Sequence, residues 1–230
     1  MIEVTYINHM GDDLSVVNAA RVSFGKKSKL VCTNLVLGTY DMSNGDKKLI
    51  NYLAKHRHMS PFGHAFASFH IKAPIFVARQ LVKHKFLRWN AISRRYVDDE
   101  PAFYEPDVWR GRSADKKQGS AGEVELRGDS FGVGYEPWWG DGSLQETTLY
   151  IYKDLLEQGV CPEQARMVLP QSTMTEWYWS GSLDAFADMC RLRITPDTQY
   201  ESKQVALGID KKMLKLFPVS WKALEGCHSD

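Results

Sequence analysis

Lysine and arginine side chains gather in residues 78–96, together with a histidine, a glutamine, an asparagine and a serine. Such groups carry positive charge or donate hydrogen bonds, and they therefore bind phosphate and other anions. Gln80, Lys83 and His84 are spaced three and four residues apart, which places them on one face of an expected helix. An irregular loop is expected over residues 90–96. A helix and a loop could thus converge on one phosphorylated, planar ligand.

Two alternatives exist for this basic segment. A run of charges is commonly a solvated face of a protein. The segment from Lys83 to Arg95 could also serve as a non-enzymatic nucleic-acid-binding module, which would bind oligonucleotides with a steep salt dependence. However, the chain of 230 residues has a net charge of only +1. Its basic residues are local, so nucleic acid is not the expected partner.

The elements that must position this segment alternate between strands and helices. A strand over Ala65–Lys72 delivers the chain to a helix that begins near Pro74, a residue that the first helical turn tolerates. Upstream, residues Ile2–Ile7 alternate as an edge strand. Asp12 or Asp13 can cap the helix that follows, and Asp46–Lys55 carries the apolar stripe of another helix.

The second half of the chain begins with an excursion over residues 97–142, which is rich in glycine, aspartate, proline and lysine and predicts little regular structure. A helix over Leu144–Gln158 is expected to end at Gly159. The pattern then predicts an extended run over Arg166–Trp179. A further helix would carry Arg193 near its C-terminal end, and a final long helix is predicted to start at Pro196.

The composition narrows the class of protein. No linker or repeat separates autonomous modules, so residues 1–230 are expected to form a single α+β domain. No apolar run reaches transmembrane length and no signal segment opens the chain, so a cytoplasmic location is the default, or the host cytoplasm if the source is viral. The histidine spacings suit no compact metal motif, and no metal is expected. The four cysteines are scattered and suggest buried or incidental thiols.

The order of residues 83–96 resembles the signature of the flavin-dependent thymidylate synthases, Arg-His-Arg-x-x-Ser-x-Asn-x-x-Ser-x-Arg-Tyr. This chain reads Lys-His-Lys-Phe-Leu-Arg-Trp-Asn-Ala-Ile-Ser-Arg-Arg-Tyr. The histidine, the asparagine, the second serine, the last arginine and the tyrosine agree. Both flanking arginines are lysines here, and the first serine is Arg88.

Five further segments match this family in the right order along the chain. Residues 13–24 resemble its opening helix and the serine that contacts flavin phosphate, and residues 58–64 its His-x-Thr-Pro-Phe-x-His turn. Residues 69–80 are similar to the strand and helix that lead into the signature. Ala-Arg-Met-Val-Leu-Pro over residues 165–170 resembles Ala-Arg-x-Val-Leu-Pro, and residues 192–201 resemble the later Leu-Arg, Ala-Gln and Glu series.

The resemblance implies a fold and a reaction. The fold is a central, mostly antiparallel sheet flanked by helices, in a homotetramer whose active sites lie between subunits. The reaction is the reductive methylation of dUMP to dTMP, with methylenetetrahydrofolate as one-carbon donor and with FAD, reduced by NADPH, as hydride carrier. No cysteine nucleophile is needed, and no cysteine here lies in a recognisable nucleophile motif.

The resemblance also implies roles for individual residues. Arg193 matches the arginine that polarises the pyrimidine, as the catalytic group. The dUMP site would comprise Arg193 with Gln80, Lys83, Ser93, Arg94, Arg95 and Arg166. The FAD site would comprise Ser23, His58, Ser60, His84, Lys85 and Asn90. Folate and NADPH contacts are not assigned.

Several positions depart from the family pattern. Lysine lacks the planar two-pronged donor of arginine, so Lys83 and Lys85 would bind phosphate as flexible point charges. Arg94 stands where glycine is usual, and Ala91 replaces a frequent glutamate. Along the expected flavin-binding wall, the family's asparagine, arginine and histidine are replaced by Ser182, Asp184, Asp188 and Asp197. These changes keep a second outcome open, in which water attacks the exocyclic methylene and gives 5-hydroxymethyl-dUMP.

Overall fold

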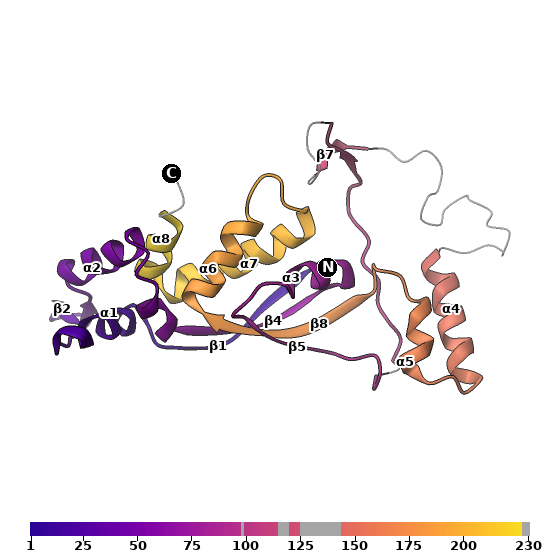
Figure 1. Cartoon of the computed structure of the whole chain (residues 1–230), viewed down its shortest axis with the longest axis horizontal. Coiled ribbons are helices and arrows are strands. Elements are labelled where there is room, and N and C mark those ends of the chain that lie inside the picture. The colour runs from indigo at the N-terminus through magenta and orange to yellow at the C-terminus, as the bar shows by residue number, and fades with distance from the viewer. Residues whose placement is uncertain (98, 115–119, 125–143, 227–230) are drawn as a thin grey trace.

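The core of the structure is a four-stranded antiparallel sheet (Figure 1). The computed structural model describes residues 1–97, 99–114, 120–124 and 144–226. Its sheet has the strand order β1-β4-β8-β5, and each neighbouring pair is antiparallel. The strands are β1 (Glu3–Met10), β4 (Phe66–Pro74), β8 (Met174–Ser182) and β5 (Arg88–Ala91). The predicted central antiparallel sheet is confirmed.

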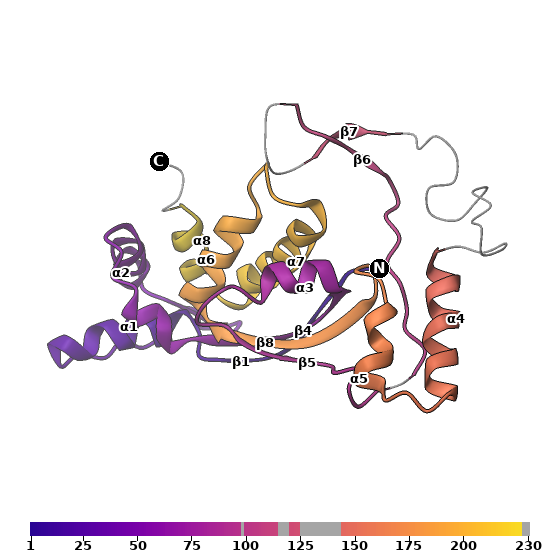
Figure 2. The ribbon, with the colours of Figure 1, turned by 45° about the vertical axis from the view of Figure 1, so that its right-hand side comes forward.

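Helices cover one face of this sheet, as Figure 2 shows. They are α3 (Ile75–Leu81), α6 (Leu183–Arg193), α7 (Tyr200–Leu216) and α8 (Pro218–Gly226). Because successive side chains of a strand point to opposite faces, burial alternates along the central strands. Phe69 and Ile71 on β4 and Trp177 and Trp179 on β8 are buried, whereas Tyr178 between the tryptophans is exposed.

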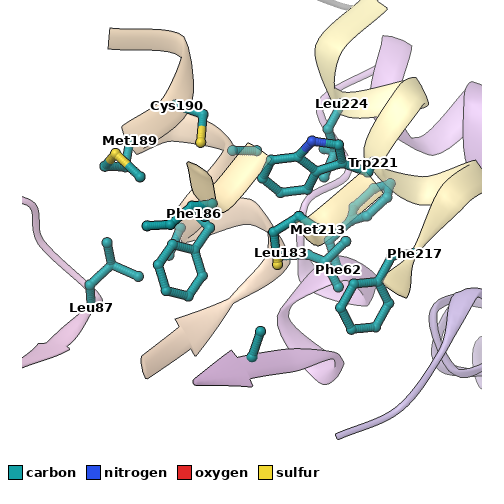
Figure 3. Packing of buried hydrophobic residues seen from close by; sticks show 14 of the residues in the cluster. Phe62, Leu87, Leu183, Phe186, Met189, Cys190, Met213, Phe217, Trp221 and Leu224 are labelled. Atoms are coloured by element: carbon teal, nitrogen blue, oxygen red, sulfur yellow. The ribbon is translucent and has the colours of Figure 1, made fainter. Parts of the chain in front are cut away.

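Aromatic and aliphatic side chains from the helices and the sheet form one hydrophobic core (Figure 3). The ring of Phe186 on α6 meets Phe69 and Trp179 edge to face, at centroid distances of 5.3 and 5.7 Å. Each such side chain contributes roughly 1.5–3 kcal/mol when it is fully buried. Gly181 lets β5 approach β8 closely, since a Cβ atom there would clash with Leu87 Cδ2.

The N-terminal elements pack beside the sheet at one end of the molecule (Figure 1). Asp12 caps the first helix as predicted, because its carboxylate accepts from the Ser15 amide at 2.7 Å and Ser15 Oγ accepts from the Asp12 amide at 3.1 Å. Ser43 caps the second helix. The elements of this region are α1 (Asp13–Arg21), η1 (Val22–Phe24), β2 (Val31–Asn34), β3 (Thr39–Asp41), α2 (Asn44–Lys55) and η2 (Ser60–His64).

The predicted excursion over residues 97–142 contains a short hairpin in its described part, which the composition did not predict. The rest of that excursion lies largely outside the described residues. Gly159, with a φ of 85°, follows the helix that was predicted to end there. The elements of this region are β6 (Arg110–Arg112), β7 (Ser120–Glu123), α4 (Leu144–Glu157), α5 (Pro162–Ala165) and η3 (Arg166–Val168).

Two sequence-based boundaries were wrong. The chain from Arg166 begins with the 3-10 turn η3, and extended pairing starts only at Met174. The final helix starts at Tyr200 rather than Pro196, because Thr198 Oγ1 donates to the Leu192 carbonyl at 3.2 Å and holds a turn after α6. A second helix, α8, follows at Pro218, whose ring nitrogen cannot donate a helical hydrogen bond.

Of the cysteines, Cys190 is buried and free, Cys32 and Cys161 are exposed, and Cys227 lies outside the described residues. Within the described ranges, no helix has both the length and the apolar character needed to cross a membrane.

Candidate active site

A cavity of about 880 Å³ opens where the C-terminal ends of α3 and α6 meet the start of α7. The described part of the excursion and residues 170–172 form its remaining walls. Gln80 and Arg193, two of the residues expected to bind dUMP, both line this cavity. The walls also include Phe76, Tyr104, Trp109, Arg110, Tyr200 and Glu201. The space suits a ligand of nucleotide size, lined by aromatic faces with a few polar groups.

Gln80 is held from the opposite helix. It lies one residue before the end of α3, and its amide oxygen accepts a hydrogen bond from the hydroxyl of Ser202 on α7. Ser202 is wholly buried. The Gln80 side chain is therefore anchored at one end of its amide while it lines the cavity.

Arg193 is held by His84. The Nε–H group of Arg193 donates to Nε2 of His84 at 2.9 Å. This geometry requires a neutral imidazole, since a protonated ring nitrogen cannot accept. Burial of the half-buried ring, reinforced by the Arg193 charge, lowers the pKa of His84 to about 4. Burial also lowers the pKa of Arg193 from its usual value. His84 thus remains an acceptor at neutral pH.

A carboxylate anchors the excursion to the cavity wall. Glu201, in the first turn of α7, is only 4% exposed and accepts from Arg110 Nη2 and, at 3.3 Å, from the Tyr104 hydroxyl. The Arg110 guanidinium also lies 4.3 Å from the ring centroid of Tyr200. Burial, followed by the Glu201 charge, raises the pKa of Tyr104 to about 12.

Tyr104 and Arg110 were not among the residues predicted for the site, because the excursion shows no periodicity that would place them against a helix. The combination of aromatic and arginine side chains in an otherwise polar loop was the available signal. The contacts to Glu201 cross more than ninety positions of sequence, with separations of 97 and 91 residues. Such pairings follow from the tertiary fold.

The other residues expected to bind dUMP lie elsewhere in the chain. Ser93 and Arg95 contact each other, with Arg95 Nε 3.3 Å from Ser93 Oγ. Arg94 donates to the carbonyl of Asp99 at 2.7 Å, and the exposed Arg166 donates to the carbonyl of Glu163 at 3.1 Å. These four residues do not line the cavity that holds Gln80 and Arg193. Within one chain, the expected clamp is in two parts.

The prediction that Gln80, Lys83 and His84 share one face of a helix is wrong. Helix α3 ends at Leu81, so Gln80, Lys83 and His84 do not share a helical face. Lys83 is exposed and lies outside the cavity, whereas the chain turns after α3 and directs His84 toward Arg193. Asn90 is likewise not on an irregular loop. It lies on strand β5, opposite Tyr178.

The residues expected around FAD fall in two regions. Ser23, His58 and Ser60 are exposed near the end that carries α1 and α2, where His58 stacks on Tyr52 at 6.1 Å between ring centroids. His84, Lys85 and Asn90 lie on β5 and the turn before it. Exposed hydroxyl, imidazole, ammonium and amide groups suit the phosphates and ring carbonyls of a flavin nucleotide. These donors fit such a cofactor in chemical type.

The expected flavin wall on α6 is acidic in this chain. Ser182 donates to Asp184 at its start, and Asp188 pairs with Arg191 at 3.4 Å. These carboxylates replace groups that would donate hydrogen bonds to a flavin. Any contact of this helix to a flavin would therefore differ from the pattern that the resemblance implies.

Comparison with known proteins decides the family. The family model described as thymidylate synthase complementing protein matches residues 5–219. The chain belongs to the flavin-dependent thymidylate synthases. It is 40% identical over 223 residues to the flavin-dependent thymidylate synthase of Kosmotoga olearia, covering 96% of this chain and 88% of that protein. It is 37% identical over 222 residues to that of Thermus thermophilus, covering 96% of this chain and 75% of that protein.

Two solved structures share the fold of this chain. The UMP/dUMP methylase PolB from Streptomyces cacaoi, bound with 5-Br dUMP, matches with a TM-score of 0.75 and 27% sequence identity, over 98% of this chain and 95% of that chain. The same protein bound with 5-Br UMP matches with a TM-score of 0.76. The chain is therefore an enzyme of the flavin-dependent thymidylate synthase family, and the family name implies a flavin cofactor.

Proposed function

We propose that this chain converts dUMP to dTMP, with methylenetetrahydrofolate as one-carbon donor and NADPH as reductant. The observation that supports this most is the presence of Gln80 and Arg193 in one nucleotide-sized cavity, with His84 orienting the arginine. The methylase neighbour with bound 5-Br dUMP supports the choice of nucleotide. When bound, FAD reduced by NADPH would supply the hydride that completes the methyl group.

Arg193 would stabilise negative charge on the pyrimidine as its C5 atom becomes nucleophilic. A fixed guanidinium is effective here because it needs no reorganisation during the reaction. Its Nε–H is committed to His84, so the two terminal nitrogens remain for the substrate. Gln80 would contact the base from α3. Lys83, exposed in one chain, would approach the nucleotide as a mobile point charge.

The phosphate clamp of Ser93, Arg94, Arg95 and Arg166 would come from a neighbouring subunit. This explains why these residues lie apart from the cavity within one chain. A homotetramer with sites between subunits satisfies that requirement, with each subunit folded as one domain over residues 1–230. We place the enzyme in the cytoplasm, where its nucleotide and folate substrates are made.

Ser23, His58, Ser60, His84, Lys85 and Asn90 would hold the flavin. Their hydroxyl, imidazole and ammonium groups would orient the cofactor through its phosphates and ring atoms, without any metal. His84 serves two partners in this arrangement, because its Nε2 accepts from Arg193 and its other ring nitrogen is left to donate.

One observation favours a second product. The acidic side chains of Asp184 and Asp188 on α6 replace donors along the expected flavin wall. If hydride transfer is impaired there, water would attack the exocyclic methylene and release 5-hydroxymethyl-dUMP. The clamp and the folate requirement would be unchanged.

A single-turnover assay with dUMP, methylenetetrahydrofolate and NADPH tests the proposal when the products are resolved by mass. We expect yellow purified protein with flavin absorbance and a product with the mass of dTMP. The mass of 5-hydroxymethyl-dUMP would establish the second outcome. Colourless protein that binds oligonucleotides with a steep salt dependence would instead support a nucleic-acid-binding module.

A further inference from the structure

Ser202 is a buried serine near the start of helix α7. It lies in the first turn of α7, has no exposed surface, and donates its hydroxyl to the amide oxygen of Gln80 on α3. The two residues are separated by 122 positions in sequence. A buried hydroxyl of this kind normally has a partner for its proton. Within the part of the chain that the structure describes, Gln80 Oε1 is that partner.

This contact determines which end of the Gln80 amide faces Ser202. The amide has an oxygen that accepts and an NH2 group that donates. If the amide turned over, its NH2 group would donate to the Ser202 oxygen, and the buried hydroxyl proton would lose the acceptor that it has among the described residues. Leaving such a group unpaired costs free energy. The contact therefore holds the amide oxygen against Ser202 and leaves the NH2 group as the free end.

We propose that Ser202 is a positioning residue that orients the Gln80 NH2 group toward the nucleotide and thereby selects a pyrimidine that accepts hydrogen bonds at that edge. This inference rests on the proposed function, in which the cavity lined by Gln80 receives dUMP. The new elements are the Gln80 amide nitrogen, which would donate a hydrogen bond to the base, and Ser202, which holds that amide in its orientation.

Arg193 strengthens the selection. A guanidinium has donors and no acceptor, and its Nε–H is already bound to His84. The two side chains proposed to contact the base then both present donors. Uracil carries carbonyl oxygens on its edge, which accept hydrogen bonds. Cytosine carries an amino group in place of one of these oxygens, which would oppose a donor. Ser202 thus favours dUMP over dCMP.

The test compares two buried serines in the flavin-loaded enzyme. Ser202→Ala removes the hydroxyl that fixes the amide. Ser220→Ala is the matched control, because Ser220 on α8 is equally buried, has a hydroxyl without a partner among the described residues, and lies outside the cavity. For each protein, kcat and KM are measured with dUMP, and dCMP is measured as a competitive inhibitor.

We expect Ser202→Ala to raise the KM for dUMP by about tenfold and to reduce the preference for dUMP over dCMP by about tenfold, since a freely turning amide can present either end. Ser220→Ala should keep the wild-type KM and preference. If folded, flavin-loaded Ser202→Ala keeps the wild-type preference, the role of Ser202 is overturned. If Ser202 acted only in packing, Ser202→Ala would lower the thermal midpoint of unfolding without changing the preference for dUMP over dCMP. That result would also overturn the proposed role.

Gln80→Glu provides an independent reading if Ser202→Ala does not fold. The carboxylate keeps an oxygen toward Ser202 and replaces the NH2 group by a second oxygen, which accepts. We expect the ratio of dCMP to dUMP affinity to rise by about tenfold or more. An unchanged ratio would overturn the inference. Failure of the wild-type enzyme to bind dUMP would instead overturn the proposed function, so the two failures are distinguishable.

Discussion

Arg193 Nε donates a hydrogen bond to His84 Nε2 at 2.9 Å, which joins the last residue of α6 to the turn after α3. The contact orients a guanidinium that lines the cavity and depends on a neutral imidazole. The pKa of His84, lowered to about 4 by burial and by the Arg193 charge, keeps the ring in that form. The orientation of the Arg193 guanidinium and the protonation state of His84 are thereby linked.

Arg193→Ala should abolish nucleotide methylation while FAD remains bound. The proposed contact of Arg193 is to the pyrimidine, and its loss would remove about 3 kcal/mol of charge stabilisation, which corresponds to roughly a hundredfold in rate. Single-turnover rates and flavin absorbance measure the two effects. Arg191→Ala is the control, because Arg191 is exposed on the same helix and pairs with Asp188. Wild-type turnover by Arg193→Ala would refute the assignment.

Acid should destabilise the flavin-free fold through His84. Its pKa is 6.5 in the unfolded reference and about 4 when folded, so the unfolded chain binds more protons between these values. The contribution of His84 to the free energy of unfolding therefore falls as the pH drops below about 6.5. Between about pH 7 and pH 5 we expect a loss of roughly 1 kcal/mol, allowing for the half-exposed ring.

Urea denaturation at both pH values measures this loss. His84→Gln is the control, because its amide oxygen still accepts from Arg193 while its side chain does not titrate. The variant should lose less stability than the wild type on acidification. Equal losses would mean that other groups account for the acid sensitivity.

Lys83→Arg should be tolerated. It restores the residue of the family signature and supplies two parallel donors for a phosphate or carbonyl. Lys83 is exposed, so the longer planar group meets no packed neighbour within the described part of the chain. We expect kcat/KM for dUMP to stay within about threefold of the wild-type value, a change smaller than about 1 kcal/mol. A hundredfold loss would indicate a site rebuilt around lysine.

Arg110→Met should loosen the excursion. The change leaves the buried Glu201 carboxylate with the Tyr104 hydroxyl and without its charged partner. Removing one member of such a pair costs about 2 kcal/mol or more. Urea denaturation measures the loss, and Arg112→Met, at an exposed position of the same strand, is the control. A second change, Glu201→Gln, should recover part of the loss, and no recovery would contradict the pairing.

Mixed oligomers test whether the site is shared. Arg95→Ala and Arg193→Ala oligomers should each be inactive. When the two are co-expressed, some sites should carry both defects and others neither, so activity should partly return. Affinity tags on the two chains verify that mixed oligomers form. If these stay inactive while each variant is folded and flavin-loaded, the clamp must be built within one subunit.

The sequence by itself determined the class of fold and most of its elements. Apolar residues alternate over residues 65–72 and form one stripe on each of α2 and α6. This periodicity is local, because an element that buries one face must repeat apolar residues on that face. Asp12 and Gly159 marked helix ends, because capping and a positive φ depend on residue type. The order of residues 83–96 indicated the family, because these residue types reflect ligand binding rather than packing in the core.

Only the tertiary structure decided how the site is assembled. The signature reads as one continuous segment, yet α3 ends at Leu81, so Lys83 faces solvent while His84 meets Arg193. Lys83 and His84 therefore point in different directions, because the chain leaves the helical path after Leu81. The contacts of Gln80 with Ser202 and of Arg110 with Glu201 join segments far apart in sequence. Such contacts arise from the packing of α3 and the excursion against α7, which no local pattern specifies.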